Sequence, residues 1–118
     1  VKLDGDIEAY RLYGSLFFGT ANRFEELMDP RKPIPKILVL SLANLLNIDA
    51  SGIESLENLV KYLHSKNSRL IIAGANGQVL SLLKRSGFYD RIGQHKFYDS
   101  TATALKFAAE LLGQKITP

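Results

Sequence analysis

The sequence predicts an α/β fold with a mixed, mostly parallel β-sheet, and two observations carry this prediction. Residues 36–42 and 69–74 form nearly continuous apolar runs of strand length, which is typical of strands buried on both faces. Each run is followed by a segment whose apolar residues recur at helical spacing. Because strands that alternate with helices favour parallel pairing, we expect about four to five strands backed by about four helices.

The composition fits one domain that needs neither a metal nor disulfides to fold. The chain has 118 residues, of which 46% are hydrophobic and 23% charged, and it contains no cysteine. A chain of this length buries enough surface to fold alone, so we expect a single domain over residues 1–118. No apolar run approaches the roughly 20 residues that span a bilayer, so the chain as given is expected to be soluble.

The charge pattern argues against a nucleic-acid partner. The formal net charge is +3, from 15 basic and 12 acidic residues. Lys and Arg are not interleaved with aromatic residues along one face, which a nucleic-acid-binding surface would favour. We therefore expect no nucleic-acid binding.

The N-terminal third predicts two strands and a helix. Residues 7–13 alternate apolar and polar side chains, the period of a half-buried strand. Gly14 is expected to turn the chain into a second short strand at residues 16–18, which would make the sheet mixed at one edge. Asn22 begins a capping-box pattern and predicts a helix that ends before Pro30.

The middle of the chain predicts two further helices. The first follows the strand at residues 36–42 and the loop at residues 48–52, and its apolar positions are Ile53, Leu56, Leu59, Val60 and Leu63. After the strand at residues 69–74, the other helix is expected from about Gly77 to Arg85, with Gly87 as its stop.

The C-terminal segment predicts a brief strand at residues 97–98 and a final helix. Asp99 or Ser100 is expected to cap that helix, and Gly113 to end it. The predicted order is therefore strand, strand, helix, and then three strand–helix pairs.

Signatures of catalysis are missing from the sequence. No dinucleotide fingerprint follows the first strand, and no P-loop or nucleophile elbow occurs anywhere. The strand that ends at Leu42 is followed by no carboxylate, so a phosphate-accepting receiver domain is excluded. His64 and His95 are far apart in polar surroundings and are expected to be surface residues. We expect no enzymatic activity, no cofactor and no metal.

A glycine-rich turn is a weak candidate for phosphate or nucleotide binding. It joins a predicted strand to a predicted helix and contains Gly74, Asn76 and Gly77. Backbone N–H groups at such a junction attract phosphate, although connections of this kind use glycine routinely.

The segment Asp49-Ala50-Ser51-Gly52 is the strongest candidate for a functional loop. Free N–H groups and the positive end of the helix dipole favour anions there. A phosphate on Ser51 would be tolerated and would add nearly two negative charges to the surface. A purely structural interpretation stands beside this one: Asp49 and Ser51 are both good N-cap residues, and Ser51 with Glu54 has the spacing of a capping box.

Three features of the sequence belong together: the loop at residues 49–53, the polar tail of the helix that follows, and the run at residues 69–74. Their combination resembles the STAS family, which joins sulfate transporters with anti-sigma-factor antagonists. The resemblance covers almost the whole chain and implies a mixed sheet backed by about four helices. In the freestanding antagonists a partner kinase phosphorylates a serine in this loop. By that resemblance Ser51 matches the modified serine and Asp49 the acidic residue before it.

Residues 13–21, with Phe17-Phe18-Gly19, resemble the start of STAS domains attached to SulP-type permeases. This resemblance implies the cytoplasmic, C-terminal, non-catalytic regulatory domain of an inorganic anion transporter of the sulfate type, on the cytoplasmic face of a membrane. The implied partners are the membrane domain of its own transporter, a second STAS domain or a cytosolic regulatory protein. The alternative is a freestanding anti-sigma-factor antagonist with Ser51 as its switch, and a third interpretation is a small α/β enzyme.

Overall fold

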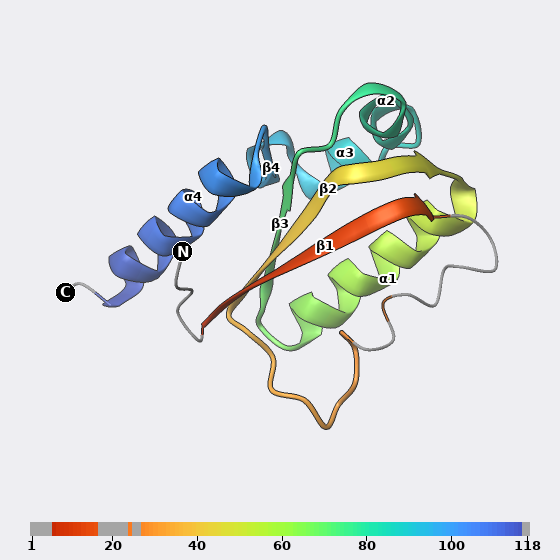
Figure 1. Ribbon diagram of the computed structural model, residues 1–118. Helices are drawn as coiled ribbons and strands as arrows, with labels where there is room; N and C mark the ends of the chain where they lie inside the picture. Colours follow the sequence, from red (N-terminus) through yellow and green to blue (C-terminus); the bar gives the residue numbers. More distant parts are fainter. Residues whose placement is uncertain (1–5, 17–23, 25–26, 117–118) are drawn as a thin grey trace.

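The computed structural model describes residues 6–16, 24 and 27–116 (Figure 1). Its sheet has the order β1-β2-β3-β4, and every pair of neighbours is parallel. The strands are β1 (Ile7–Leu16), β2 (Ile37–Ile48), β3 (Arg69–Ala73) and β4 (Phe97–Tyr98). The helices are α1 (Ala50–Ser65), α2 (Gly77–Arg85), α3 (Phe88–Ile92) and α4 (Thr101–Ile116), and a 3-10 turn, η2 (Gln94–Lys96), precedes β4. The predicted α/β fold with about four to five strands and about four helices is confirmed. All strand pairs in the described sheet are parallel, so the predicted mixed edge is not observed among these strands.

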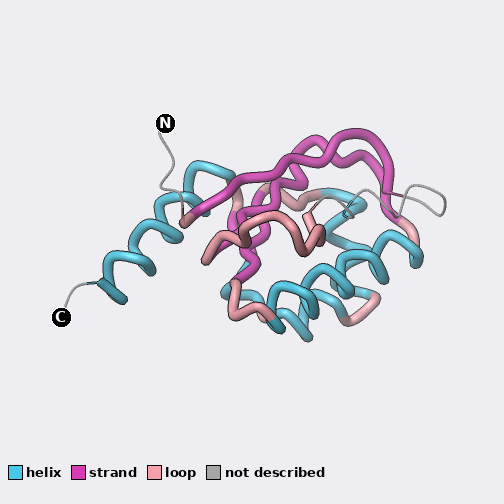
Figure 2. Tube along the Cα trace, turned by 90° about the horizontal axis from the view of Figure 1, so that it is seen from below, coloured by secondary structure: helices cyan, strands magenta, loops and turns pink. Residues whose placement is uncertain are grey.

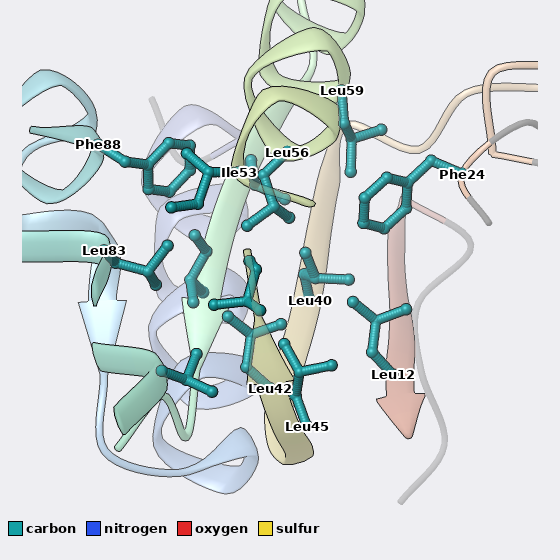
Figure 3. Packing of buried hydrophobic residues seen from close by; sticks show 14 of the residues in the cluster. Leu12, Phe24, Leu40, Leu42, Leu45, Ile53, Leu56, Leu59, Leu83 and Phe88 are labelled. Carbon is teal, nitrogen blue, oxygen red and sulfur yellow. The ribbon is translucent and has the colours of Figure 1, made fainter. Parts of the chain in front are cut away.

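The sheet is buried on both faces, and different helices cover each face (Figure 2). Because side chains alternate along a strand, the even-numbered residues of β2 up to Leu42 pack against α1, α2 and α3. Figure 3 shows part of this larger cluster, including Leu40, Leu56 and Phe88. The odd-numbered residues from Ile37 to Val39 pack against α4 instead. This two-sided burial accounts for the continuous apolar runs in the sequence.

The first strand corrects the predicted turn at Gly14. Gly14 has φ +75°, yet it lies inside β1, which continues alongside β2 until Leu16 pairs with Ile48. Pairing with β2 accommodates the unusual backbone as a local irregularity in a continuous strand. Residues 17–23, which include the rest of the predicted second strand and the start of the predicted helix, lie outside the described residues. Phe24 is fully buried in the larger cluster.

The second strand is longer than predicted. It continues past Leu42, and its buried residues then recur at every third position, at Leu45 and Ile48. The register explains this period, because at two places β2 has one more residue than β1 between consecutive pairs. Strand prediction relies on a period of two, and the extra residue in each bulge interrupts that period, so the sequence pattern does not show the second half of β2 as a strand.

The C-terminal half confirms the predicted bounds of α2 and corrects the end of α4. Gly87 follows α2 with φ +87°. The next helix, α3, begins directly after it, and its five residues are too few to show a helical period in the sequence. Ser100 caps α4, because the Thr103 N–H donates to Ser100 Oγ over 3.1 Å. Gly113 does not end α4, which continues to Ile116. A glycine costs only about 1 kcal/mol in a helix, so the helix can continue through it.

Candidate functional site

Asp49 fixes the start of α1. Its backbone is extended, with φ −121° and ψ −175°, and its Oδ1 accepts a hydrogen bond from the Gly52 N–H over 3.0 Å. Its carbonyl oxygen accepts the first intrahelical bond, from the Ile53 N–H, also over 3.0 Å. Asp49 is therefore the N-cap of α1. The sequence offered Asp49 and Ser51 for this role, and the structure confirms Asp49.

Ser51 is inside the helix, as its second residue, so the predicted capping box of Ser51 and Glu54 does not form. Its side chain is half-buried, and its hydroxyl makes no hydrogen bond to another described residue. Its carbonyl oxygen accepts a bond from Ser55 Oγ over 3.1 Å. The first turn of α1 carries no acidic residue. A phosphate on Ser51 would therefore meet the positive end of the helix, with the Asp49 carboxylate before it and the Glu54 carboxylate three residues further along α1.

The glycine-rich turn after β3 has a structural explanation. Gly74 has φ +75°, and a Cβ on it would lie 2.8 Å from the Cβ of Ala43 in β2. The Asn76 side-chain amide donates to the Gly74 carbonyl over 3.0 Å, which closes the turn before α2. Gly77 has φ +53°, and a Cβ on it would meet no atom within 4 Å. Close packing and turn geometry thus account for Gly74 and Asn76, and phosphate binding at this turn stays a prediction.

The structure does not bring the two candidate loops together. Both follow the carboxyl ends of neighbouring parallel strands, but β2 last pairs with β3 where Ser41 meets Ala73. It then continues to Ile48, adding up to roughly 20 Å of strand before the loop at residues 49–52. In Figure 1 this extension carries the start of α1 well past the turn at residues 74–77. A single site that combines both loops is therefore excluded.

A strip of exposed side chains leads along the extension toward the loop, and sequence reasoning missed it. Tyr13 is 56% exposed and Leu46 is 69% exposed, the two exposed large hydrophobic residues of the described chain. Tyr13 pairs with Asn44, two positions before Leu46, and its neighbour Leu12 is buried against the larger cluster. Because neighbouring side chains point to opposite faces, Tyr13 lies on the face away from α1. We call Tyr13, Ala43, Asn44 and Leu46 the exposed strip.

The two histidines are exposed, as predicted, but they line one cavity. The cavity has a volume of about 480 Å³ and lies between α1, β3, α3, η2 and α4. His64 comes from the last turn of α1 and His95 from η2, so the fold brings together residues that are distant in sequence. In the described residues no group of three His, Cys, Asp or Glu side chains could hold a metal ion.

None of the helices described is long and apolar enough to cross a bilayer.

The fold is that of a known class of domain. The family model described as "STAS domain" matches residues 1–104, and the chain therefore belongs to the STAS family. It is related to the STAS domains of SulP-family sulfate transporters.

Three relatives illustrate this relationship. A crystal structure of a sulfate transporter family protein from Wolinella succinogenes superposes with a TM-score of 0.88 at 26% identity, over 96% of this chain and 93% of that one. The SulP transporter STAS domain from Vibrio cholerae superposes with a TM-score of 0.84 at 29% identity, over 96% and 88%. Sulfate transporter 1.3 of Arabidopsis thaliana is 30% identical over 93 residues, which are 78% of this chain and 14% of the transporter.

The chain matches only part of each transporter in sequence. The alignments span 10–18% of the length of the curated relatives. By contrast, the Vibrio cholerae STAS domain is matched over most of its length. The shared unit is therefore the STAS domain.

Proposed function

We propose that this chain is the cytoplasmic C-terminal STAS domain of a SulP-family inorganic anion transporter of the sulfate type, with a regulatory, non-catalytic role. The observation that carries the proposal is the match over nearly the full length of the Vibrio cholerae SulP STAS domain. The sulfate transporters among the sequence relatives support the same transporter class. Transport itself would belong to a membrane domain, and this domain would act through protein contacts.

The exposed strip supports a contact with the membrane domain of the same transporter. A side chain such as Leu46, which is 69% exposed, gains free energy when a partner covers it. Leu46 lies three residues before the Asp49 cap, so a partner on the strip would also reach the start of α1. A second STAS domain or a cytosolic regulatory protein would be an alternative occupant of the same surface.

The gene and a transport assay test this proposal. The reading frame upstream of Val1 is expected to encode a membrane domain, and a frame without apolar helices would contradict the proposal. In the full transporter, Leu46→Asp is expected to lower the initial rate of sulfate uptake. Ala109→Asp, which adds the same charge at an exposed position of α4, is the matched control. Equal uptake by both variants at equal membrane abundance would argue against a role for the strip.

The position of Ser51 favours a second candidate function, in which the domain is a phosphorylation-controlled partner switch. Capping is performed by Asp49, and the Ser51 hydroxyl is left without a bond to a described residue. Incubation with candidate kinases is expected to add a phosphate that maps to Ser51 by mass spectrometry. Ser55→Ala should still be modified and Ser51→Ala should not. Equal modification of both variants would sink this assignment.

A further inference from the structure

The cavity between α1, β3, α3, η2 and α4 has a lining of one charge sign. No carboxylate is among the described residues that line it. Its basic side chains come from four elements in two separate segments of the chain, residues 64–69 and 91–96, and they are His64, Arg69, Arg91, His95 and Lys96. The tertiary fold thus gathers cationic groups that no sequence motif announces.

The cavity lies beside a part of β3 that lacks a neighbouring strand. Within the described chain, β4 pairs with β3 only at Ile72 and Ala73. Residues 69–71 therefore have β2 on one side and the cavity on the other. The end of α1 lines the cavity from one face of the sheet, and α4 lines it from the other. The cavity is thus bounded by rigid secondary structure on three sides.

Two of the cations lack a counterion in the described chain. Arg91 forms an ion pair with Glu57, which offsets its charge. Arg69 and Lys96 make no ion pair with any described residue. Burial lowers the pKa of Lys96, and the positive charge of Arg69 lowers it further. Lys96 and Arg69 therefore repel each other, and a bound anion would relieve that repulsion.

The remaining wall is apolar and offers few competing polar groups. Ser68 is buried, and its hydroxyl already donates to the Pro35 carbonyl over 2.8 Å. The apolar lining comprises Val60, Leu70, Ile71, Ile92, Phe107 and Leu111. A volume of about 480 Å³ is in the range of cavities that hold small organic ligands. The shape and lining therefore suit an anion that carries an apolar body.

We propose that this cavity binds a phosphate monoester with an aromatic or aliphatic body. The phosphate dianion lies between Arg69 and Lys96, whose two charges it matches. The body of the ligand packs on the wall formed by Phe107 and Leu111. This site is separate from the exposed strip and from the loop at residues 49–52.

Phenyl phosphate is the probe that tests this site, with phenol and inorganic phosphate as the two partial ligands. Amide chemical shifts of the 118-residue chain are followed by NMR at low salt. We expect shifts that cluster at residues 64–71, 91–96 and 107–111, and tighter binding of phenyl phosphate than of either partial ligand. The pKa of Lys96, followed through its side-chain NMR signals, is expected to rise when phenyl phosphate binds.

Charge-removing variants distinguish this site from adsorption to a basic surface. Lys96→Gln and, independently, Arg69→Gln are each expected to weaken phenyl phosphate binding at least about tenfold. Lys61→Gln removes one positive charge at an exposed position of α1 outside the cavity and should leave binding unchanged. Absence of binding, equal effects of the Lys61 and Lys96 variants, or equal affinity for inorganic phosphate would each overturn the proposal.

Discussion

Substitution of Asp49 tests the assignment of helix capping and phosphorylation to different residues. Asp49→Ala removes the carboxylate that accepts from the Gly52 N–H over 3.0 Å. Loss of an N-cap side chain costs about 1 kcal/mol, within a range of roughly 0.5–2 kcal/mol. For a chain of this length that corresponds to a melting temperature lower by about 4 °C. Urea denaturation followed by circular dichroism measures the free energy of unfolding directly.

Two further variants make the reasoning refutable. Asp49→Asn keeps a side-chain oxygen that can cap, so it should retain most of the stability. Ser51→Ala should change the free energy of unfolding by less than about 0.5 kcal/mol, because the Ser51 hydroxyl is not part of the cap. If Ser51→Ala destabilised the domain as much as Asp49→Ala, the separation of the two roles would be wrong.

Three other predictions concern the core, the turn after β3 and the cationic cavity. Gly74→Ala should destabilise the domain by about 1–3 kcal/mol, and clearly more than Gly77→Ala. Both glycines have positive φ, but only at Gly74 would the new Cβ meet a β2 side chain, at 2.8 Å. If urea denaturation showed the same loss in the free energy of unfolding for both variants, the steric argument would be refuted. Leu59→Ala should cost about 2–5 kcal/mol, because Leu59 is fully buried in the larger cluster, and a loss below about 1 kcal/mol would contradict that packing. Burial and the charge of Arg69 lower the pKa of Lys96 in the folded state below its ordinary value of 10.5. Between these two pKa values the unfolded state binds more protons than the folded state. The free energy of unfolding should therefore rise with pH across this window. Lys96→Gln should flatten that rise when urea midpoints are compared from neutral pH to about pH 10, and an unchanged slope would argue against the predicted shift.

Local patterns predicted the elements whose boundaries depend on their own residues. The apolar run at residues 70–73 forms most of β3, because burial on both faces of the sheet requires apolar side chains at successive positions. The bounds of α2 followed from its periodicity and from Gly87. Asp49 was predicted as a cap candidate because a short side chain with an oxygen, placed just before an amphipathic helix, can accept a hydrogen bond from a backbone N–H of the first turn.

Positions whose outcome depends on partners distant in sequence were predicted poorly. Gly14 has the positive φ that suggests a turn, but pairing with β2 keeps β1 continuous through it. The bulges of β2 exist only relative to β1, so the strand's extension to Ile48 was not visible in its own pattern. Gly113 remains inside α4, whose neighbouring Leu112 is buried.

The sequence by itself determined the α/β class, the strands buried on both faces and the loop at residues 49–52, because these depend on periodicity and on near neighbours. The tertiary structure alone decided between Asp49 and Ser51 as the cap, since the choice depends on where the first helical hydrogen bond forms. It also decided that His64, Arg69 and Lys96 line one cavity. Sequence separation carries no information on such proximity, which arises only when α1, β3, η2 and α4 pack together.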